Sequence, residues 1–410
     1  MRSVLLPLSA LLAGVALLLS GAGLLGTLVA MRASAEGFAD ATIGLIASGY
    51  FAGFLAGTAL APRLVRRIGH IRAFAFYAAA TAALVLGHAL VPQPAAWLLL
   101  RFATGVALVG LYTVIESWLS AQAAPAQRGQ VLAVYMMVNL AALAIGQQLL
   151  KAWPVQDFAL FALVAMLVAA AVLPVTWTRL AQPELPRSER LGLAELYQRA
   201  PAAVAGAGLS GLALSAFWGL APLFMARMGR DPAAVATFMS CVIVGGAALQ
   251  LPLGRLSDRL DRRLVLALLS AAAALVALAS LSTLGPDGRG LYLAGFAFGG
   301  LAFTLYPVAV AHLMDRLPPS AMLSGSSSLL LVHGVGAVLG PLLAGAALGR
   351  FGPIALPLHF AACLGALALF AAWRWRSGRP PADQPAHFAP MLRTTPAALE
   401  MLADRQPSAR

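Results

Sequence analysis

The feature that most constrains this chain is a series of apolar runs, each long enough to cross a membrane. Because a helix rises about 1.5 Å per residue, about 20 apolar residues span a hydrocarbon layer roughly 30 Å thick. Twelve such runs cover residues 4–30, 41–61, 73–91, 95–119, 129–150, 157–177, 202–226, 235–256, 264–284, 289–313, 324–347 and 353–373. The sequence therefore predicts an all-α polytopic membrane protein with twelve transmembrane helices.

Composition agrees with this class and argues against nucleic-acid binding. Hydrophobic residues make up 60% of the chain and charged residues 10%, whereas about a quarter of the residues in soluble proteins are charged. The net charge of +13 comes from short basic clusters between the apolar runs, which is typical of membrane topology. We expect the lipid bilayer as a partner, and no nucleic acid.

No motif indicates an enzyme, a metal site or a cofactor. Lys151 is the only lysine and lacks the context of a phosphate-binding loop, which argues against an ATP-driven pump. Neither H-E-x-x-H nor G-x-S-x-G occurs, and Cys241 and Cys363 both lie in apolar runs. We therefore expect no catalytic residues, no metal and no cofactor.

Arginine and lysine residues in the loops predict the orientation, because cytoplasmic loops carry an excess of them. With the N-terminus in the cytoplasm, 21 of these residues fall on the cytoplasmic side and 6 on the other, while Arg101 stays in the membrane. Both termini are therefore predicted to be cytoplasmic.

A polar stretch near the middle of the chain, rich in charges of both signs, divides it into two halves. The predicted parts are an N-terminal six-helix bundle at 1–178, a cytoplasmic linker at 179–201, a C-terminal six-helix bundle at 202–374 and a cytoplasmic, mostly disordered tail at 375–410. The linker is expected to carry a short surface helix near 187–199. One short helix is predicted in the tail at 396–404.

The two halves carry traces of an internal duplication. A shift of 194 residues places Gly105, Leu111, Tyr112, Val114 and Leu119 on Gly299, Leu305, Tyr306, Val308 and Leu313. Two pseudo-symmetric six-helix bundles with a site between them near the midplane are a transporter architecture.

Arg101 lies inside the fourth apolar run, where inserting an arginine costs about 2.5 to 3.5 kcal/mol near the helix centre. Steps of four and three residues place it on one helical stripe with Gly105, Tyr112 and Glu116, so we expect this stripe to face protein or a wet cavity. The alternative is a structural arginine that bonds helix carbonyls or reaches the membrane surface. Glu116 is interpreted either as a proton carrier or as the partner of a basic residue in a gate.

Other polar and aromatic residues near span centres are candidates for the cavity. His333 lies near the centre of the eleventh run, and the 194-residue shift places it on Asn139. Since histidine exchanges protons near physiological pH, His333 is a candidate proton site, with a hydrogen-bonded packing residue as the alternative. Tyr306 repeats Tyr112, and each is either a cavity residue or a core aromatic.

The loop between the eighth and ninth runs carries the most specific motif. It reads Gly254-Arg-Leu-Ser-Asp258-Arg259-Leu-Asp261-Arg262-Arg263. This resembles the G-x-L-x-D-R-x-G-R-R signature of the major facilitator superfamily, with Asp261 in place of the internal glycine. The resemblance implies a gating role for Gly254, Asp258, Arg259, Arg262 and Arg263, whereas a solvated loop with positive-inside arginines is the alternative.

The corresponding loop of the first half is a second candidate gating loop. It keeps the internal glycine as Gly69, and it has Arg66 where the family usually has aspartate, followed by Arg67. Further segments also resemble the family. Arg101 with Gly105 and Gly110 is similar to the arginine motif of its fourth helix, and Gly336-Ala-Val-Leu-Gly340-Pro341 is similar to a glycine-proline motif that implies helix packing.

The stretches Glu116-Ser117-Trp118 and Leu305-Tyr306-Pro307 resemble the YcaD-like branch of bacterial facilitators. These resemblances imply a monomeric secondary active transporter of the bacterial inner membrane, which moves a small-molecule substrate by alternating access and couples to protons. A non-transporting receptor or sensor on the same fold is the alternative.

Overall fold

The computed structural model describes residues 2–123, 127–176, 191–283, 289–377, 388–391 and 395, and it describes the side chains of these residues except 2–7, 283, 289, 319 and 377. Among these residues, twelve helices are long and apolar enough to cross a bilayer. The predicted all-α fold with twelve spans is confirmed.

The helices fall into two halves that follow one another in the sequence. The first half contains α1 (Arg2–Ala35), α2 (Asp40–Ile68), α3 (His70–Leu90), α4 (Pro94–Gln122), α5 (Arg128–Gln148) and α6 (Phe158–Ala170), which α7 (Val172–Thr176) continues. The second half contains α9 (Pro201–Arg227), α10 (Pro232–Ser257), α11 (Arg262–Ala279), α12 (Arg289–Met314), α13 (Met322–Phe351) and α14 (Ala355–Ser377). The short elements are η2 (Leu149–Lys151), α8 (Leu193–Arg199), η3 (Ser280–Thr283) and η4 (Pro319–Ala321).

Local sequence signals set where several helices begin and end. Asp231 caps α10 by accepting a hydrogen bond from the backbone nitrogen of Ala234 at 2.7 Å, and Pro232 stands in the first turn, where its missing N–H costs nothing. α2 continues beyond the predicted run at 41–61 and ends at Ile68, because Gly69 adopts a φ of 82° that a side chain disfavours.

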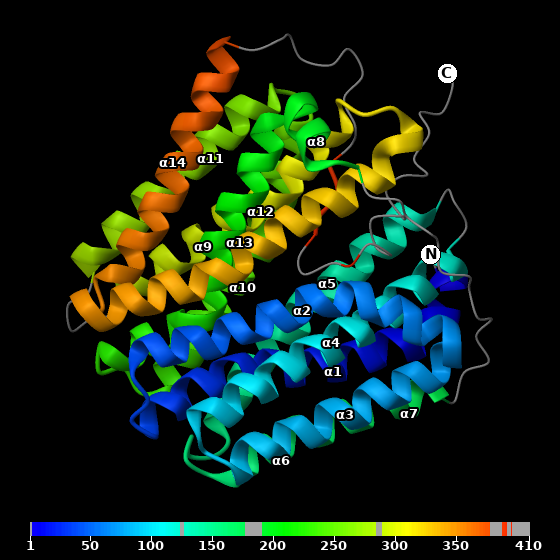
Figure 1. Cartoon of the computed structure of the whole chain (residues 1–410), viewed down its shortest axis with the longest axis vertical. Helices are drawn as coiled ribbons and strands as arrows, with labels where there is room; N and C mark the ends of the chain where they lie inside the picture. Colours follow the sequence, from blue (N-terminus) through cyan, green and yellow to red (C-terminus); the bar gives the residue numbers. More distant parts are fainter. Residues whose placement is uncertain are drawn as a thin grey trace.

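Each half pairs its helices in the same order (Figure 1). In the first half α1 contacts α5, α2 contacts α4, and α3 contacts α6. The matching pairs of the second half are α9 with α13, α10 with α12, and α11 with α14. Between the halves, α2 contacts α13 and α5 contacts α10. Because α2 corresponds to α10 and α5 corresponds to α13, these two contacts are equivalent in the two halves. This pairing supports the duplication that the 194-residue shift indicated.

Glycines at matching positions let the paired helices touch. A Cβ atom on Gly105 would overlap the carbonyl oxygen of Tyr50 at the α2–α4 crossing. A Cβ atom on Gly299 would overlap the carbonyl oxygen of Val242 at the α10–α12 crossing. Because the 194-residue shift relates Gly105 to Gly299, one crossing geometry occurs in both halves.

The halves meet closely on one side of the membrane. We call this the far side, which carries the α1–α2 and α13–α14 connections; the motif side carries the α2–α3 and α10–α11 connections. On the far side a Cβ atom on Gly44 would overlap the carbonyl oxygen of Pro341, so α2 and α13 touch through their backbones. Arg227 of α9 also pairs with Asp40 of α2, at 2.5 Å between Nη2 and Oδ1. The far side is therefore closed by contacts between the halves.

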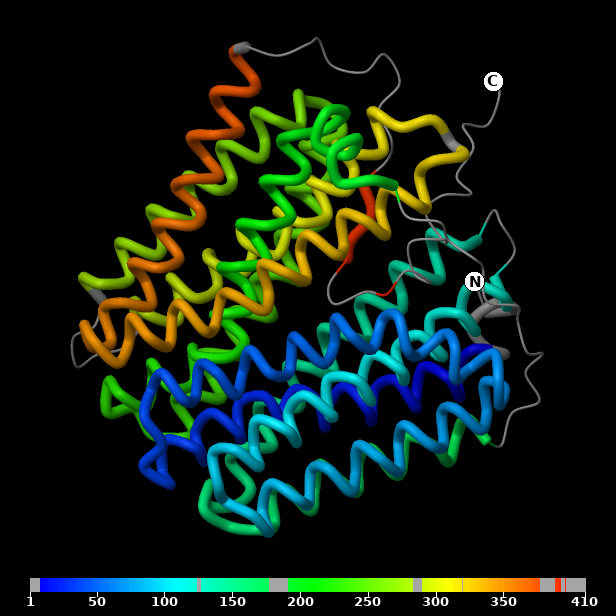
Figure 2. Tube along the Cα trace, viewed as in Figure 1, coloured from blue at the N-terminus to red at the C-terminus, as the bar shows by residue number. Residues whose placement is uncertain are grey.

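A second contact between the halves closes the far side at α5 and α10. Gln148 donates from Nε2 to the hydroxyl of Ser240 at 2.5 Å, and Ser240 in turn donates to the carbonyl oxygen of Ala144 at 3.1 Å. On the motif side the halves diverge, and the described part of the C-terminal tail lies between them (Figure 2).

The structure describes part of the linker and part of the tail. α8 (Leu193–Arg199) lies where a short surface helix was expected, and the expected start at 187 lies outside the described residues. The helix predicted at 396–404 also lies outside them. Phe388, Ala389, Met391 and Thr395 are buried, so the described residues of a tail expected to be mostly disordered are packed against the bundles.

Candidate functional site

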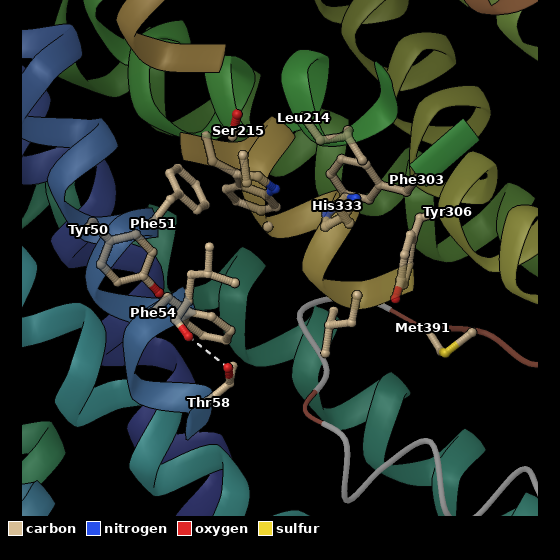
Figure 3. A pocket seen from close by; sticks show the side chains of 15 residues that line it. Tyr50, Phe51, Phe54, Thr58, Leu214, Ser215, Phe303, Tyr306, His333 and Met391 are labelled. Atoms are coloured by element: carbon tan, nitrogen blue, oxygen red, sulfur yellow. Dashed lines mark hydrogen bonds between the residues drawn. The ribbon is translucent and has the colours of Figure 1, made fainter. Parts of the chain in front are cut away.

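A cavity of about 860 Å³, including its open mouth, lies between the halves near the middle of the spans (Figure 3). Four helices and the tail contribute its lining: Tyr50, Phe51, Phe54, Leu55 and Thr58 of α2, Leu214, Ser215 and Trp218 of α9, Phe303 and Tyr306 of α12, Leu330, His333, Gly334 and Ala337 of α13, and Met391. These fifteen described residues include no aspartate, glutamate, lysine or arginine.

Six of the fifteen lining residues carry a phenylalanine, tyrosine or tryptophan ring. Trp218 stacks on Phe303, with ring centroids 5.6 Å apart and planes inclined by 25°. On the opposite wall the ring of Tyr50 contacts that of Phe51 at 5.1 Å. Such a wall offers flat apolar surfaces and a few polar atoms, so it suits a planar, largely apolar molecule.

His333 contributes an imidazole to this wall, and a hydrogen bond to α9 holds its ring in place. Its Nδ1 lies 3.1 Å from the carbonyl oxygen of Ala207 on α9. Since a carbonyl only accepts, Nδ1 carries the hydrogen, and Nε2 of the neutral ring is an acceptor. The ring of Tyr306 lies 4.4 Å from that of His333, so the structure brings together two of the predicted site residues. Both line the cavity (Figure 3).

Arg101 lies behind the cavity wall and does not line the main cavity. Its Cζ sits 4.5 Å from the centroid of the Tyr50 ring, and its side chain is buried at 7% exposure. Arg101 lines a smaller neighbouring pocket of about 350 Å³, which shares Tyr50, Phe51 and Trp218 with the main cavity. The guanidinium therefore points into the protein, one ring away from the main cavity.

Tyr112 and Asn139 are buried but lie outside the main cavity lining. The ring of Tyr112 is 6.0 Å from that of Phe54, so Tyr112 forms a layer behind the wall. Asn139, at 2% exposure, lies on α5 one turn after Tyr135. The structure therefore does not bring Asn139 together with His333 in the main cavity, although the 194-residue shift relates the two residues.

Glu116 lies at the motif side of α4 and is completely buried. Tyr135 of α5 donates to its Oε1 at 3.1 Å. Thr395 of the tail donates to its Oε2 twice, from the backbone nitrogen at 2.8 Å and from the hydroxyl at 2.5 Å. Glu116 therefore connects α4, α5 and the tail, and it does not line the main cavity.

The second-half motif forms a network of ion pairs between α10, α11 and α12. Arg262 pairs with Asp258 at 3.1 Å and with Asp315, just after α12, at 2.7 Å. Arg262 also donates to the hydroxyl of Ser257 at 3.1 Å. Because one buried guanidinium joins three partners, it ties the motif-side ends of three helices together.

Asp261, which replaces the family's glycine, caps α11. Its side chain accepts from the backbone nitrogen of Arg263 at 2.9 Å and pairs with the guanidinium of Arg263 at 2.6 Å. Burial raises the pKa of Asp261, but these hydrogen bonds and the positive charge of Arg263 outweigh it and lower the pKa below its usual value. Arg263 also donates to the carbonyl oxygen of Arg374 at 3.1 Å, which ties α11 to α14.

The described contacts of the first-half loop join fewer residues than those of the second-half motif. Arg66 and Arg67 are exposed, as is Arg259 in the second half. His70, directly after Gly69, is buried, and its Nε2 lies 3.0 Å from the hydroxyl of Ser117 on α4. This bond ties the start of α3 to α4 next to Glu116.

The glycine-proline segment of α13 packs against both halves. A Cβ atom on Gly336 would overlap the carbonyl oxygen of Gly208, and one on Gly340 would overlap that of Leu212, both on α9. The carbonyl oxygen of Pro341 contacts Gly44 of α2. These small residues therefore let α13 lie between α9 and α2, where its contacts help to close the far side.

Sequence reasoning missed the aromatic wall and the tail. Tyr50, Phe51 and Trp218 lie in the middle of their spans, whereas tyrosine and tryptophan in membrane proteins are enriched at the interfaces. That unusual depth was a signal for the cavity. Phe388 and Met391 stand in a polar, proline-rich stretch without helical periodicity, and no pattern in the sequence indicates that they are buried.

Comparisons with known proteins agree with the helical architecture. The sequence profile of the Major Facilitator Superfamily matches residues 10–204 and 203–406. The uncharacterized MFS-type transporter YcaD of Escherichia coli (strain K12 / DH10B) is 31% identical over 337 residues, which cover 82% of this chain and 87% of that protein. The uncharacterized MFS-type transporter Ent638_1421 of Enterobacter sp. (strain 638) matches with the same identity and coverage.

Solved structures share the fold at low sequence identity. The nucleoside transporter NupG superposes with a TM-score of 0.74 and 15% identity, covering 90% of this chain and 98% of that one. A bacterial homolog of the human lysosomal transporter Spinster, in an inward-facing and occupied conformation, superposes with a TM-score of 0.66 and 16% identity, covering 98% of each chain.

Proposed function

The chain belongs to the major facilitator superfamily of membrane transporters, and we propose that it is a secondary active transporter that moves a small molecule by alternating access. The observation that carries this proposal is the cavity between the two halves, closed on the far side by α2–α13 and α5–α10 contacts. A rocking motion that opens these contacts and closes the motif side would expose the same cavity to the other side.

The substrate fits best as a planar, largely apolar solute without a full positive charge. The cavity wall offers the faces of Trp218, Phe303 and Phe51, but its described lining holds no carboxylate to balance a cation. Nε2 of His333 and the hydroxyls of Ser215 and Tyr306 supply a few hydrogen-bonding positions. Displacement of water from such a wall favours an aromatic or amphipathic molecule.

The motif side is assigned to the cytoplasm of a bacterial inner membrane. This assignment rests on the excess of arginine in the loops of that side, 21 basic residues against 6. Both termini are then cytoplasmic, and in the described conformation the halves meet on the outer side and diverge on the cytoplasmic side. Within it, the network around Arg262 and Asp258 would hold the second half together while the halves rock.

Coupling to protons is assigned to Glu116 or His333. Glu116 is a buried carboxylate at the cytoplasmic end of α4, and His333 is an imidazole in the cavity wall. A carboxylate or an imidazole that changes its solvent access between two conformations is able to carry a proton across. Arg101 supports this arrangement as a fixed positive charge behind Tyr50.

A ligand screen by thermal unfolding of the purified full chain tests the substrate class. A ligand at 100 times its Kd raises the stability by about 2.7 kcal/mol, so planar neutral compounds are expected to raise the melting temperature. The variant Phe51→Ala, which removes a ring from the cavity wall, should reduce the shift, whereas Phe76→Ala, at an exposed position of α3, should not. Stabilisation by cations alone, or an equal shift in both variants, would reject this cavity as the site.

A further inference from the structure

The described tail residues join the two halves on the motif side. We use the name tail anchor for Phe388, Ala389, Pro390, Met391 and Thr395. From the second half, Asp258 accepts a hydrogen bond from the backbone nitrogen of Phe388 at 2.9 Å. From the first half, Glu116 accepts two hydrogen bonds from Thr395. The tail anchor is therefore bound to both bundles at the side where they diverge.

Gln250 of α10 holds the middle of the tail anchor. Its Nε2 donates to the carbonyl oxygen of Met391 at 2.9 Å and to the carbonyl oxygen of Phe303 at 3.0 Å. Phe303 belongs to the cavity wall, so one amide connects the tail directly to the wall. Gln250 is buried at 3% exposure. If the tail left, the amide of Gln250 would lose the carbonyl oxygen of Met391 as a partner unless water or substrate took that place.

Apolar contacts complete the docking site. The ring of Phe388 occupies the space beside Gly254, where a Cβ atom would overlap the ring. Met391 is 2% exposed and lines the main cavity (Figure 3). A methionine side chain adapts its shape to an irregular apolar surface, and here it faces the same space as the aromatic wall.

We propose that Glu116, Gln250, Gly254 and Asp258 form a binding site for an extended peptide, and that the chain's own tail anchor fills it as a tethered plug at the mouth of the cavity. The plug lies at the mouth and Met391 contributes to the cavity lining, so a substrate that enters from the motif side has to pass the plug. The plug must also leave before the halves close on the motif side, since it lies between groups of both halves. Release of the tail is thus a step that regulates access to the cavity. The effect of this release on transport rests on the proposed function, whereas its effect on access to the cavity does not.

Cysteine accessibility tests the plug without any transport assay. In a background with Cys241→Ser and Cys363→Ser, Thr58→Cys places a thiol in the cavity lining. The tail-release variant adds Phe388→Ala, Met391→Ala and Thr395→Ala. Labelling of the thiol at position 58 in inside-out vesicles by a membrane-impermeant maleimide should be on the order of tenfold faster in the tail-release variant, because it loses apolar contacts and a side-chain hydrogen bond.

A matched control separates release of the tail from general loosening of the protein. Tyr197→Cys places a thiol at an exposed position of α8 on the same side of the membrane, and its labelling rate should be the same with either tail. Equal labelling at position 58 with both tails would overturn the plug, and so would a parallel rise in labelling at positions 58 and 197. Faster labelling at position 58 together with no transport of any solute would keep the plug and reject the transport proposal instead.

Discussion

The guanidinium of Arg101 lies over the ring of Tyr50 in the first half, with Cζ 4.5 Å from the ring centroid. Tyr50 lies between Arg101 and the main cavity, because it lines both the cavity and the smaller pocket that contains the arginine. Of these two pockets, Arg101 lines only the smaller one, whereas Tyr50 lines both. We propose that Arg101 acts by positioning Tyr50.

This pair predicts the effect of Arg101→Lys. The substitution keeps the charge but removes the planar guanidinium that lies over the ring, so Tyr50 should lose its fixed position. We expect transport to fall about two- to thirtyfold, since a cation–π contact is worth about 0.5 to 2 kcal/mol, while the amount of membrane-inserted protein stays unchanged.

The control for this substitution is Arg350→Lys, because Arg350 lies over the ring of Phe351 at 5.8 Å in an exposed position. It should leave transport unchanged. If Arg101→Lys and Arg350→Lys transport at equal rates, the Arg101–Tyr50 pair has no part in the mechanism.

Proton coupling predicts a separation between driven uptake and exchange. If Glu116 or His333 carries the proton, then Glu116→Gln or His333→Gln should abolish the response of uptake to an imposed pH gradient and leave substrate exchange intact. Uptake in proteoliposomes with and without the gradient measures this. His359→Gln is the matched control, because His359 lies 3.4 Å from a carbonyl of α9, as His333 does at 3.1 Å, but lies outside the main cavity lining. Retention of gradient-driven accumulation by both variants would exclude both residues as the proton site.

The motif network predicts a gating effect of Asp258→Asn. Asparagine keeps an oxygen that accepts from Phe388 but loses the charge that pairs with Arg262. We expect transport to be slower by up to about fivefold with a normal amount of folded protein, since a partly exposed pair is worth about 1 kcal/mol or less. Normal flux at normal expression would mean that the pair does not affect the balance between the two conformations.

Contact between α2 and α13 predicts that a larger residue at position 44 opens the far side. Gly44→Leu places a side chain where the carbonyl oxygen of Pro341 lies, so the two helices must separate. Spin labels at Glu36 and Phe351, which are exposed near the far-side ends of α1 and α13, should report a longer distance than in the unsubstituted chain. An unchanged distance would show that another contact sets the closed state.

Much of the fold could be predicted because membrane spans have a strong local signal. Twelve apolar runs became twelve spans, and the 194-residue shift indicated a duplication that the matching crossings at Gly105 and Gly299 support. The candidate site was harder, since periodicity identifies the stripe of a helix but not the helix that it faces. Arg101 and Tyr112 share a stripe, yet that stripe packs behind Phe54 and Tyr50 of α2 instead of lining the main cavity.

The residues of the cavity and of the tail depend on contacts between distant segments. Trp218 and Phe303 come from helices of the second half, and Tyr50 comes from the first, so their shared cavity exists only after the halves assemble. Glu116 and Thr395 are 279 residues apart in the sequence. Such contacts have no local signature, which is why Glu116 was interpreted from its position in α4 alone.

The most direct test of transport through the aromatic cavity is counterflow in proteoliposomes that contain the full chain. Vesicles are loaded with an unlabelled planar, neutral compound that stabilises the protein, and the labelled compound is added outside. We predict saturable, transient accumulation of the label, reduced in Phe51→Ala and preserved in Phe76→Ala. Binding of the compound at the cavity without any counterflow would contradict transport through this cavity and would favour a receptor on the same fold.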